Sequence, residues 1–158
     1  DVLPVVVERR IKGKVGSLRE WIEDVMPRYG HGQAPPDPAL IRDRVQLMWL
    51  FDYLIYNVDR RYHNVMLGSG WRPVYIDHSM AFGTFEKMYR PIYRFPREVV
   101  QALRGTDAQT FRDRLQPYLR EVQIEAFLRR REKVLSLVAQ RLSDAEEAQV
   151  FYSLADVR

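Results

Sequence analysis

The chain has 158 residues, of which 46% are hydrophobic and 29% charged, ordinary values for a globular protein. They exclude disordered, collagen-like and fibrous classes, and the absence of cysteine excludes disulfides, thiolate metal sites and cysteine nucleophiles. Basic residues outnumber acidic ones by 25 to 21, and all but four of the basic residues are arginine. No apolar run approaches the roughly 18 residues of a membrane span. We expect one cytoplasmic domain.

The N-terminal region is predicted to form a strand followed by a helix. Residues 4–10 contain consecutive valines, which are typical of a buried strand. Ser17 and Glu20 have the spacing of a capping box, which predicts a helix over about 18–26. Trp21 would lie on the apolar face of this helix, in the core.

A long central helix is predicted next. Residues 27–38 contain four prolines and two glycines and are expected to form a loop. Asp37 is a suitable N-cap, and Pro38 is favoured at a first helical position. The helix is expected to run to about Tyr56, and the apolar residues that cover most of its surface, Trp49 included, predict that it is buried.

The rest of the chain is predicted to form one small hairpin and several helices. Short strands are expected at 65–67 and 73–76, joined by a turn at 68–70, and an irregular segment continues to near Phe95. The later helices are expected over residues 96–104, about 107–115, 117–142 and 143–154. The predicted fold is therefore mainly α with a small β hairpin, an α+β chain.

Polar side chains gather in the only irregular stretch around the two short strands. They are Asp59, Arg60, Arg61, His63, Asn64, Asp77, His78 and Ser79. A hairpin this short brings Asn64 and Asp77 together at its open end, and oxygen ligands converging there suit a hard cation such as Mg²⁺. Asp59 would add a third oxygen group. The alternative is a polar turn whose side chains cap neighbouring backbone groups.

The spacing of these residues resembles the loops of protein and lipid kinases. Asp59 precedes Asn64 by five residues and Asp77 follows Asn64 by thirteen, as a catalytic Asp, a metal-binding Asn and a second metal-binding Asp commonly do in those families. The segments FDYLIYNVDRRYHNVML and VYIDHSMAF look like the loops of the atypical branch of the protein-kinase-like superfamily, which includes phosphatidylinositol 3- and 4-kinases, HipA-type kinases and Fam20-type kinases. The specific resemblance covers residues 51–82, and the helical remainder is compatible with a kinase C-terminal lobe.

The resemblance implies an ATP-dependent phosphotransferase that uses Mg²⁺. Asp59 would orient the attacking hydroxyl, and Asn64 and Asp77 would hold Mg²⁺ at the nucleotide phosphates. Arg60 or Arg61 would stabilise the transferring charge, with structural pairing to acidic neighbours as the alternative. The acceptor is expected to be a hydroxyl of a protein, a lipid or a small molecule, and the sequence does not choose among them.

The resemblance also implies a domain organisation. Residues 1–16 would be a hinge-like strand and linker, similar to a kinase hinge strand that leads into a helix. Residues 17–158 would be the helical lobe, with a catalytic loop at 57–67 and a metal loop at 74–82. The hinge residues expected to meet the adenine are Val7, Glu8 and Arg9, through their backbone, and Ile11, as an apolar contact. Core packing of this strand is the alternative.

A kinase site also needs a small N-terminal lobe with a phosphate-covering loop and a lysine. Only residues 1–4 precede the hinge-like strand, so we expect this lobe to be absent from the sequence and supplied by the same or another polypeptide. The chain alone is then expected to be inactive. Apolar surface should be exposed around residues 5–7 and on the open side of the hairpin.

Three alternatives remain open. Arg61, His78 and Ser79 replace the His of the common DRH motif and the Phe and Gly of DFG, and Ser lacks the backbone freedom of Gly. An inactive pseudokinase or scaffold module is therefore the first alternative. A metallohydrolase is the second, because two histidines and two aspartates lie near the hairpin ends; they are His63, His78, Asp59 and Asp77.

The third alternative is a nucleic-acid-binding helical module. Residues 96–141 contain ten basic and six acidic residues, and the densest run is 129–131. Acidic residues interleave with the basic ones at helical neighbour spacings, so ion pairs within the helix would account for most of this charge. Nucleic acid is accordingly not expected as a partner.

Overall fold

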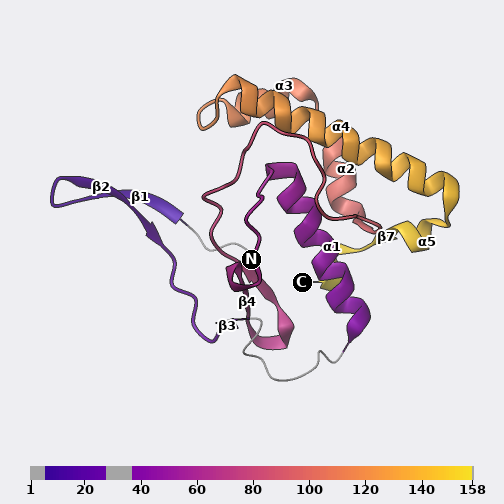
Figure 1. Ribbon diagram of the computed structural model, residues 1–158, viewed down its shortest axis with the longest axis horizontal. Helices are drawn as coiled ribbons and strands as arrows, with labels where there is room; N and C mark the ends of the chain where they lie inside the picture. The colour runs from indigo at the N-terminus through magenta and orange to yellow at the C-terminus, as the bar shows by residue number, and fades with distance from the viewer. Residues whose placement is uncertain (1–5, 28–36, 158) are drawn as a thin grey trace. The chain divides into compact units, whose positions relative to one another are not determined.

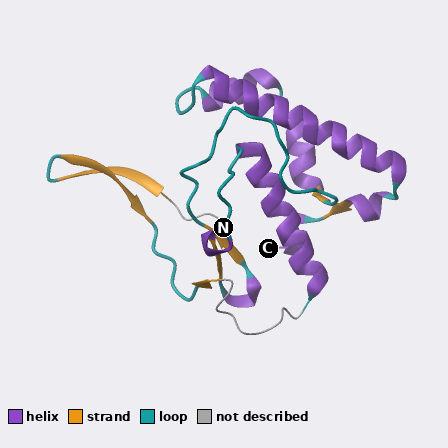
Figure 2. Cartoon of the chain, in the orientation of Figure 1, coloured by secondary structure: helices purple, strands orange, loops and turns teal. Residues whose placement is uncertain are grey.

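The computed structural model describes residues 6–27 and 37–157, without the side chains of Ile11, Leu18, Arg19 and Pro27. The chain divides into two compact units, one formed by residues 1–36 and 60–77 and the other by residues 37–59 and 78–158. Helices dominate and the sheets are small (Figures 1 and 2). This confirms the predicted class, mainly α with a small β component.

The first unit begins with a two-stranded hairpin. Strands β1 (Val6–Ile11) and β2 (Lys14–Arg19) are antiparallel, and Lys12 and Gly13 form the turn with φ of 50° and 79° (Figure 1). A strand was expected over 4–10, and its described part is confirmed, although Val6 is 54% exposed and so not buried.

The helix predicted over 18–26 is wrong. Residues 14–19 form β2, and Trp21 lies in irregular chain with 86% of its surface exposed, not in the core. Six register pairs hold β2 to β1, from Val6 opposite Arg19 to Ile11 opposite Lys14. This cross-strand pairing overrides the local capping-box signal, because helix propensity is a weak prior against tertiary context.

A three-stranded sheet completes the first unit. Strands β3 (Met26–Pro27), β4 (Val65–Leu67) and β5 (Pro73–Tyr75) are antiparallel in the order β3-β4-β5. A 3₁₀ turn, η2 (Tyr62–Asn64), precedes β4, and another, η3 (Ser69–Trp71), joins β4 to β5. The predicted β4–β5 hairpin is confirmed.

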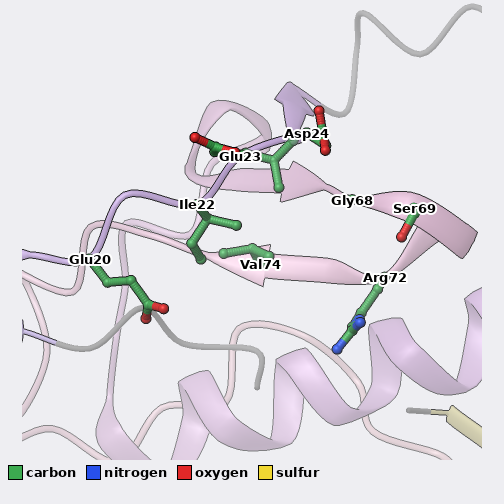
Figure 3. A pocket seen from close by; sticks show the side chains of 9 residues that line it. Glu20, Ile22, Glu23, Asp24, Gly68, Ser69, Arg72 and Val74 are labelled. Carbon is green, nitrogen blue, oxygen red and sulfur yellow. The ribbon is translucent and has the colours of Figure 1, made fainter.

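A pocket of about 340 Å³ opens in the first unit (Figure 3). Its lining combines acidic side chains, one arginine and an apolar wall where Ile22 and Val74 lie close together. The remaining lining residues are Glu20, Glu23, Asp24, Val25, Gly68, Ser69 and Arg72.

The second unit is built on helix α1 (Pro38–Ile55), which confirms the predicted central helix. The Asp37 carboxylate accepts hydrogen bonds from the backbone N–H groups of Ala39 and Leu40 at 2.8 and 3.3 Å, so it satisfies two of the unpaired donors at the helix start. The helix ends at Tyr56, whose φ of 52° turns the chain out of helical geometry.

The remaining helices agree with the prediction at first and depart from it near the C-terminus. The elements are β6 (Phe95–Pro96), α2 (Arg97–Gly105), α3 (Ala108–Leu115), α4 (Glu121–Asp144), α5 (Glu147–Val150), β7 (Phe151–Tyr152) and the 3₁₀ turn η4 (Leu154–Val157). Asp107 caps α3, which agrees with the helix expected from about 107. Helix α4 begins at Glu121, four residues later than expected.

The helix predicted over 143–154 is wrong. Ser143 lies inside α4, where its hydroxyl donates to the carbonyl of Gln140 at 2.7 Å, so it caps no new helix. After α4, the described chain has only the four α-helical residues of α5 before β7, which pairs in parallel with β6. This non-local pairing extends the chain where the local pattern favours helix.

The core of the second unit lies among α1, α2, α4 and the segments that lead into β6 and β7. Its largest fully buried apolar side chains are Leu50, Ile92, Phe95, Val100, Ile124, Val134, Val138 and Val150. Trp49, expected in the core, packs partly buried against it. No described helix is long and apolar enough to span a bilayer.

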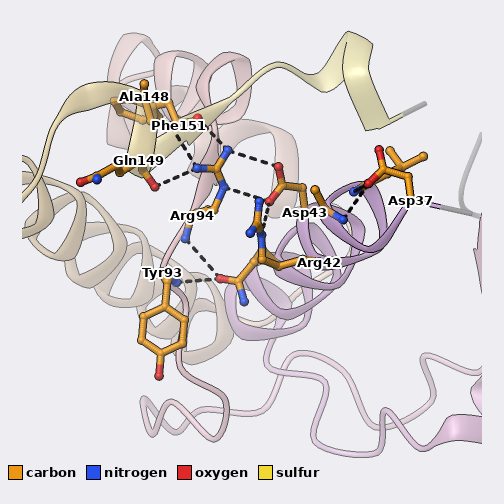
Figure 4. Close-up of polar contacts among 11 residues, drawn as sticks. Asp37, Arg42, Asp43, Tyr93, Arg94, Ala148, Gln149 and Phe151 are labelled. Atoms are coloured by element: carbon orange, nitrogen blue, oxygen red, sulfur yellow. Dashed lines mark hydrogen bonds and ion pairs between the residues drawn. The ribbon is translucent and has the colours of Figure 1, made fainter. Parts of the chain in front are cut away.

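An arginine network fixes the chain before β6 to α1 (Figure 4). The Arg94 guanidinium binds both carboxylate oxygens of Asp43, at 2.9 and 3.2 Å. It also donates to the backbone carbonyls of Ala148, Gln149 and Phe151. The Gln46 side chain accepts from the N–H groups of Tyr93 and Arg94 at 2.6 and 3.3 Å. These bonds tie three separate segments of the second unit together.

Candidate functional site

The β4–β5 hairpin determines where Asn64 and Asp77 lie. Val65 is opposite Tyr75, so Asn64 is opposite Ile76, whose N–H donates to the Asn64 carbonyl at 3.1 Å. Asp77 is the next residue, so both candidate metal ligands lie at one end of the hairpin. Asn64 is buried, with 4% of its surface exposed, whereas Asp77 is partly exposed.

Arg60 fastens that end of the hairpin. Its Nη1 donates to the carbonyls of Asn64 and Ile76, at 3.0 and 2.7 Å, and its guanidinium lies 5.4 Å from the ring centre of Tyr75. These bonds link the backbone of one candidate ligand, Asn64, to that of Ile76, the residue before the other. They support a positioning role for Arg60 through these two backbone carbonyls. Arg61 is exposed.

Asp77 has an unusual backbone. Its φ is 57°, in the left-handed region that costs most L-residues about 1–2 kcal/mol. Aspartate tolerates this region better than most residues, and such conformations cluster at functional sites, where the surrounding structure maintains them. The chain thus turns sharply at the residue that the sequence singles out as a metal ligand.

Asp59 belongs to the second unit, in the loop that follows α1. Asn57 shapes this loop: its N–H donates to the Asp52 carbonyl at 2.8 Å, and its side-chain oxygen accepts from the Asp59 N–H at 3.3 Å. The chain passes between the units after Asp59 and again after Asp77. Asp59 and Asp77, the two candidate carboxylates, are therefore each the last residue before the chain passes from one unit to the other.

The segment after Asp77 packs onto the end of α1. The His78 ring contacts Phe51 edge to face, with 5.7 Å between ring centres. The Ala81 N–H donates to the His78 carbonyl at 3.0 Å, and the Phe82 N–H donates to the Ile55 carbonyl at 2.5 Å. His78, which takes the place of the Phe of DFG, thus has an aromatic packing partner.

Arg130, on α4, holds this segment and the end of α1 together, and the sequence analysis did not single it out. Its side chain is fully buried; Nε donates to the Leu54 carbonyl at 2.9 Å, and Nη1 donates to the carbonyls of Gly83 and Phe85 at 3.0 and 2.9 Å. Burial lowers the pKa of Arg130 from its ordinary value. The guanidinium therefore binds the end of α1 and residues 83–85, which lie before and after the candidate site in sequence.

Tyr56 packs tightly beside this arginine. Its ring centre lies 5.2 Å from the Arg130 guanidinium, and a Cβ built on Gly83 would come within 2.6 Å of the ring. Burial, then the hydrogen bond from its hydroxyl to Tyr89, raises the pKa of Tyr56 to about 12. The close approach explains why glycine occupies position 83.

The basic run at 129–131 is largely occupied by contacts within the second unit. Arg129 and Lys133 bind Glu86 at 2.5 and 2.9 Å, and these bonds lower the pKa of Glu86. Arg131 is buried and donates to the carbonyls of Leu103 and Thr106. Arg131 also binds Glu132, but these two residues are adjacent and not at helical neighbour spacing, so the expected pairing at that spacing is not confirmed. Most partners come from other segments.

The residues expected to meet adenine lie on β1. Val7 is partly buried, Glu8 and Arg9 are exposed, and Ile11 lies at the end of the strand next to the turn, its side chain outside the described part. Core packing of this strand, the alternative, does not fit that exposure. The similarity to a hinge followed by a helix is wrong in its second half, because β2 follows. In the described chain β1 pairs with β2 alone, so its other edge carries backbone groups without a partner strand.

Other expected features find less support. None of the predicted site residues lines the pocket of the first unit. Within residues 6–27 and 37–157, no group of three or more His, Asp or Glu side chains could hold a metal ion, so the proposed two-histidine, two-aspartate centre is not assembled. Asn64 and Asp77, which would need phosphate oxygens to complete the ligands of Mg²⁺, are not a group of this kind.

In comparisons with known proteins, no family model and no curated sequence matches the chain. The kinase-like interpretation therefore depends on the loops themselves and on their geometry.

Proposed function

We propose that the chain is the catalytic lobe of a kinase-like phosphotransferase, which binds Mg²⁺ and ATP and transfers a phosphoryl group to a hydroxyl. One observation carries the proposal: the hairpin register brings Asn64 and Asp77 to the same end of β4–β5, at the sequence spacings that such kinases use. The left-handed backbone of Asp77 is consistent with the proposal, since such conformations cluster at functional sites.

The chain's own residues would divide the work between binding and positioning. Magnesium sites on nucleotides commonly use one or two protein oxygens, with phosphates and water completing an octahedron, and the Asn64 and Asp77 side chains supply such a pair. Arg60 would keep their two strand ends at a fixed separation through its bonds to Asn64 and Ile76. Preorganisation of this kind is what phosphoryl transfer requires, because it depends on positioning more than on covalent chemistry.

Asp59 would accept or orient the proton of the attacking hydroxyl. The Asn57 side chain holds the Asp59 backbone in place. The acceptor would be a protein, lipid or small-molecule hydroxyl. A small N-terminal lobe would complete the nucleotide site, and exposed apolar side chains in the first unit, Val6 and Trp21, are consistent with surface awaiting a partner.

An inactive pseudokinase is the second candidate. The observation in its favour is the pair His78 and Ser79 in place of Phe and Gly, with His78 packed against Phe51. Such a protein would bind nucleotide without turnover. Nucleotide binding and phosphotransfer therefore have to be measured separately.

The test is Asp59→Asn in the full-length protein. We expect kcat to fall at least about a hundredfold while the KM for ATP changes little, because a general base contributes roughly 10²–10⁴ to the rate. Asp113→Asn, an exposed change on α3, is the matched control and should leave kcat unchanged. An unchanged kcat in Asp59→Asn removes Asp59 from the mechanism, and nucleotide binding without any turnover in the parent favours the pseudokinase.

A further inference from the structure

The β1–β2 hairpin is exposed on both faces. Every residue from Glu8 to Ser17 whose side chain is described is exposed. A two-stranded hairpin that packs no face against a core is marginal in water. Its side chains are therefore available for a partner outside the unit.

Four cations surround the turn of this hairpin. They are Arg9, Arg10, Lys12 and Lys14, all exposed. None of them forms an ion pair within the described part of the chain; Arg9 and Arg10 donate only to the backbone carbonyls of Glu8 and Gly13, at 3.0 and 3.3 Å. Glu8 is the only acidic residue between positions 6 and 19. The hairpin thus carries uncompensated positive charge.

Apolar side chains accompany these cations. Val6 and Val15 are 54% and 55% exposed, and the register places both on the same face of the hairpin as Arg10. Trp21, just after β2, is 86% exposed. Exposed tryptophan and aliphatic residues next to Lys and Arg are a combination suited to the interface of a bilayer.

We propose that the β1–β2 hairpin docks onto a membrane surface that contains anionic phospholipid. The lipid headgroups would attract the four cations, and the valines and Trp21 would enter the apolar boundary beneath them. Nucleic acid fits less well, because exposed valines gain nothing from a phosphate backbone. This inference goes beyond the proposed phosphotransfer, and it assigns the exposed Val6 and Trp21 to the lipid rather than to a second lobe.

Vesicle co-sedimentation of the intact chain tests the proposal. We expect binding to phosphatidylcholine vesicles that contain about 30% phosphatidylserine, weaker binding at higher salt, and little binding to phosphatidylcholine alone. Replacing Arg9, Arg10, Lys12 and Lys14 with Gln should weaken binding about a hundredfold or more, since each cation near such a surface contributes roughly fivefold. A matched variant removes the same charge from exposed positions in the second unit: Lys87, Arg90, Arg104 and Arg114, each to Gln. It should bind like the parent.

Two single changes have opposite expected effects and keep the test independent of hairpin stability. Glu8→Gln should tighten vesicle binding several-fold by removing the one negative charge of the hairpin, whereas Trp21→Ala should weaken it several-fold. Equal loss in the hairpin and matched variants would contradict the proposal, as would equal affinity for neutral vesicles. Tighter, hairpin-dependent binding to single- or double-stranded oligonucleotides would overturn it in favour of nucleic acid.

Discussion

Two arginine-rich runs in this molecule have opposite surroundings. On β1, Arg9 and Arg10 are exposed and bond only to nearby carbonyls of their own hairpin. On α4, Arg130 and Arg131 are buried, and they bond to carbonyls 25 to 76 positions away in sequence. The same residue type thus serves as surface charge in one unit and as an internal clamp in the other.

Periodicity distinguishes the two runs. On α4, Phe127 and Val134 lie at helical spacing on either side of 130–131, so these arginines fall on the apolar stripe of the helix and have to be buried. An isolated two-stranded hairpin has no core face, and Glu8, Arg9 and Arg10 of β1 are accordingly exposed. The number of arginines in a run therefore does not predict whether they are exposed or buried. The helix or strand that carries the run decides this.

The largest expected effect comes from Arg130→Met. The change leaves the carbonyls of Leu54, Gly83 and Phe85 without this donor in a buried setting, and unsatisfied buried groups cost about 1–3 kcal/mol each, so we expect a loss of about 3–5 kcal/mol in the free energy of unfolding. Urea denaturation measures it. Arg10→Met is the control and should stay within about 0.5 kcal/mol, as exposed substitutions do. Similar values for the two variants would remove the distinction between the runs.

Asp43→Asn tests a third arginine, Arg94, whose bidentate partner is a carboxylate. Loss of the charge weakens a pair in which Asp43 is buried, and we expect a cost of about 1–3 kcal/mol in the same assay. Asp144→Asn, at the exposed end of α4, is the control. An effect no larger than that of the control would mean that the backbone bonds of Arg94 to the C-terminal segment suffice.

Gly83→Ala tests how closely the chain at position 83 packs against Tyr56, next to Arg130. The added Cβ would lie 2.6 Å from the Tyr56 ring, and overpacking of this kind costs about 1–3 kcal/mol. Gly105→Ala, at the end of α2, has no atom within 4 Å of the added Cβ and should instead stabilise the chain by up to about 1 kcal/mol. Thermal unfolding of the two variants should therefore shift in opposite directions.

The smallest expected effect is the pH dependence of Glu86 and Glu98. Hydrogen bonds from Lys133 and Arg129 lower the pKa of Glu86 below its ordinary 4.5, and bonds from the Leu154 N–H and the Ser153 hydroxyl do so for Glu98. Because the folded-state pKa values are depressed, the stabilisation is complete above pH 4.5 and disappears as the pH falls through those lower values. Glu86→Gln should therefore flatten the decline of stability below pH 4.5. A decline identical to that of the parent would contradict this.

The sequence predicted the elements whose signals are local. Asp37 and Pro38 locate the start of α1, Asp107 locates α3, and the alternation of strand and turn residues gives the β4–β5 hairpin. The same hairpin logic placed Asn64 beside Asp77. Caps and short turns depend on residues a few positions apart, which a single sequence displays.

Elements set by distant partners were missed. Strand β2 forms through pairing with β1, where a capping-box spacing favoured a helix, and β7 forms through pairing with β6, where a helix over 143–154 was expected. The buried role of Arg130 was missed because its carbonyl partners are more than 40 positions away in sequence; the run that contains it was expected to form ion pairs within its own helix. Trp21 was expected in a core that its predicted helix would have provided.

The central claim is that Asn64 and Asp77 bind Mg²⁺ with nucleotide, and thermal unfolding of the full-length protein with Mg²⁺ and ATP tests it most directly. At a hundredfold excess over Kd, a ligand of the folded state adds about 2.7 kcal/mol to stability. We expect this gain in the parent, its loss in Asp77→Asn, and its retention in Asp24→Asn, which also alters an aspartate of the first unit with positive φ. An equal gain in the parent and in Asp77→Asn would contradict the account.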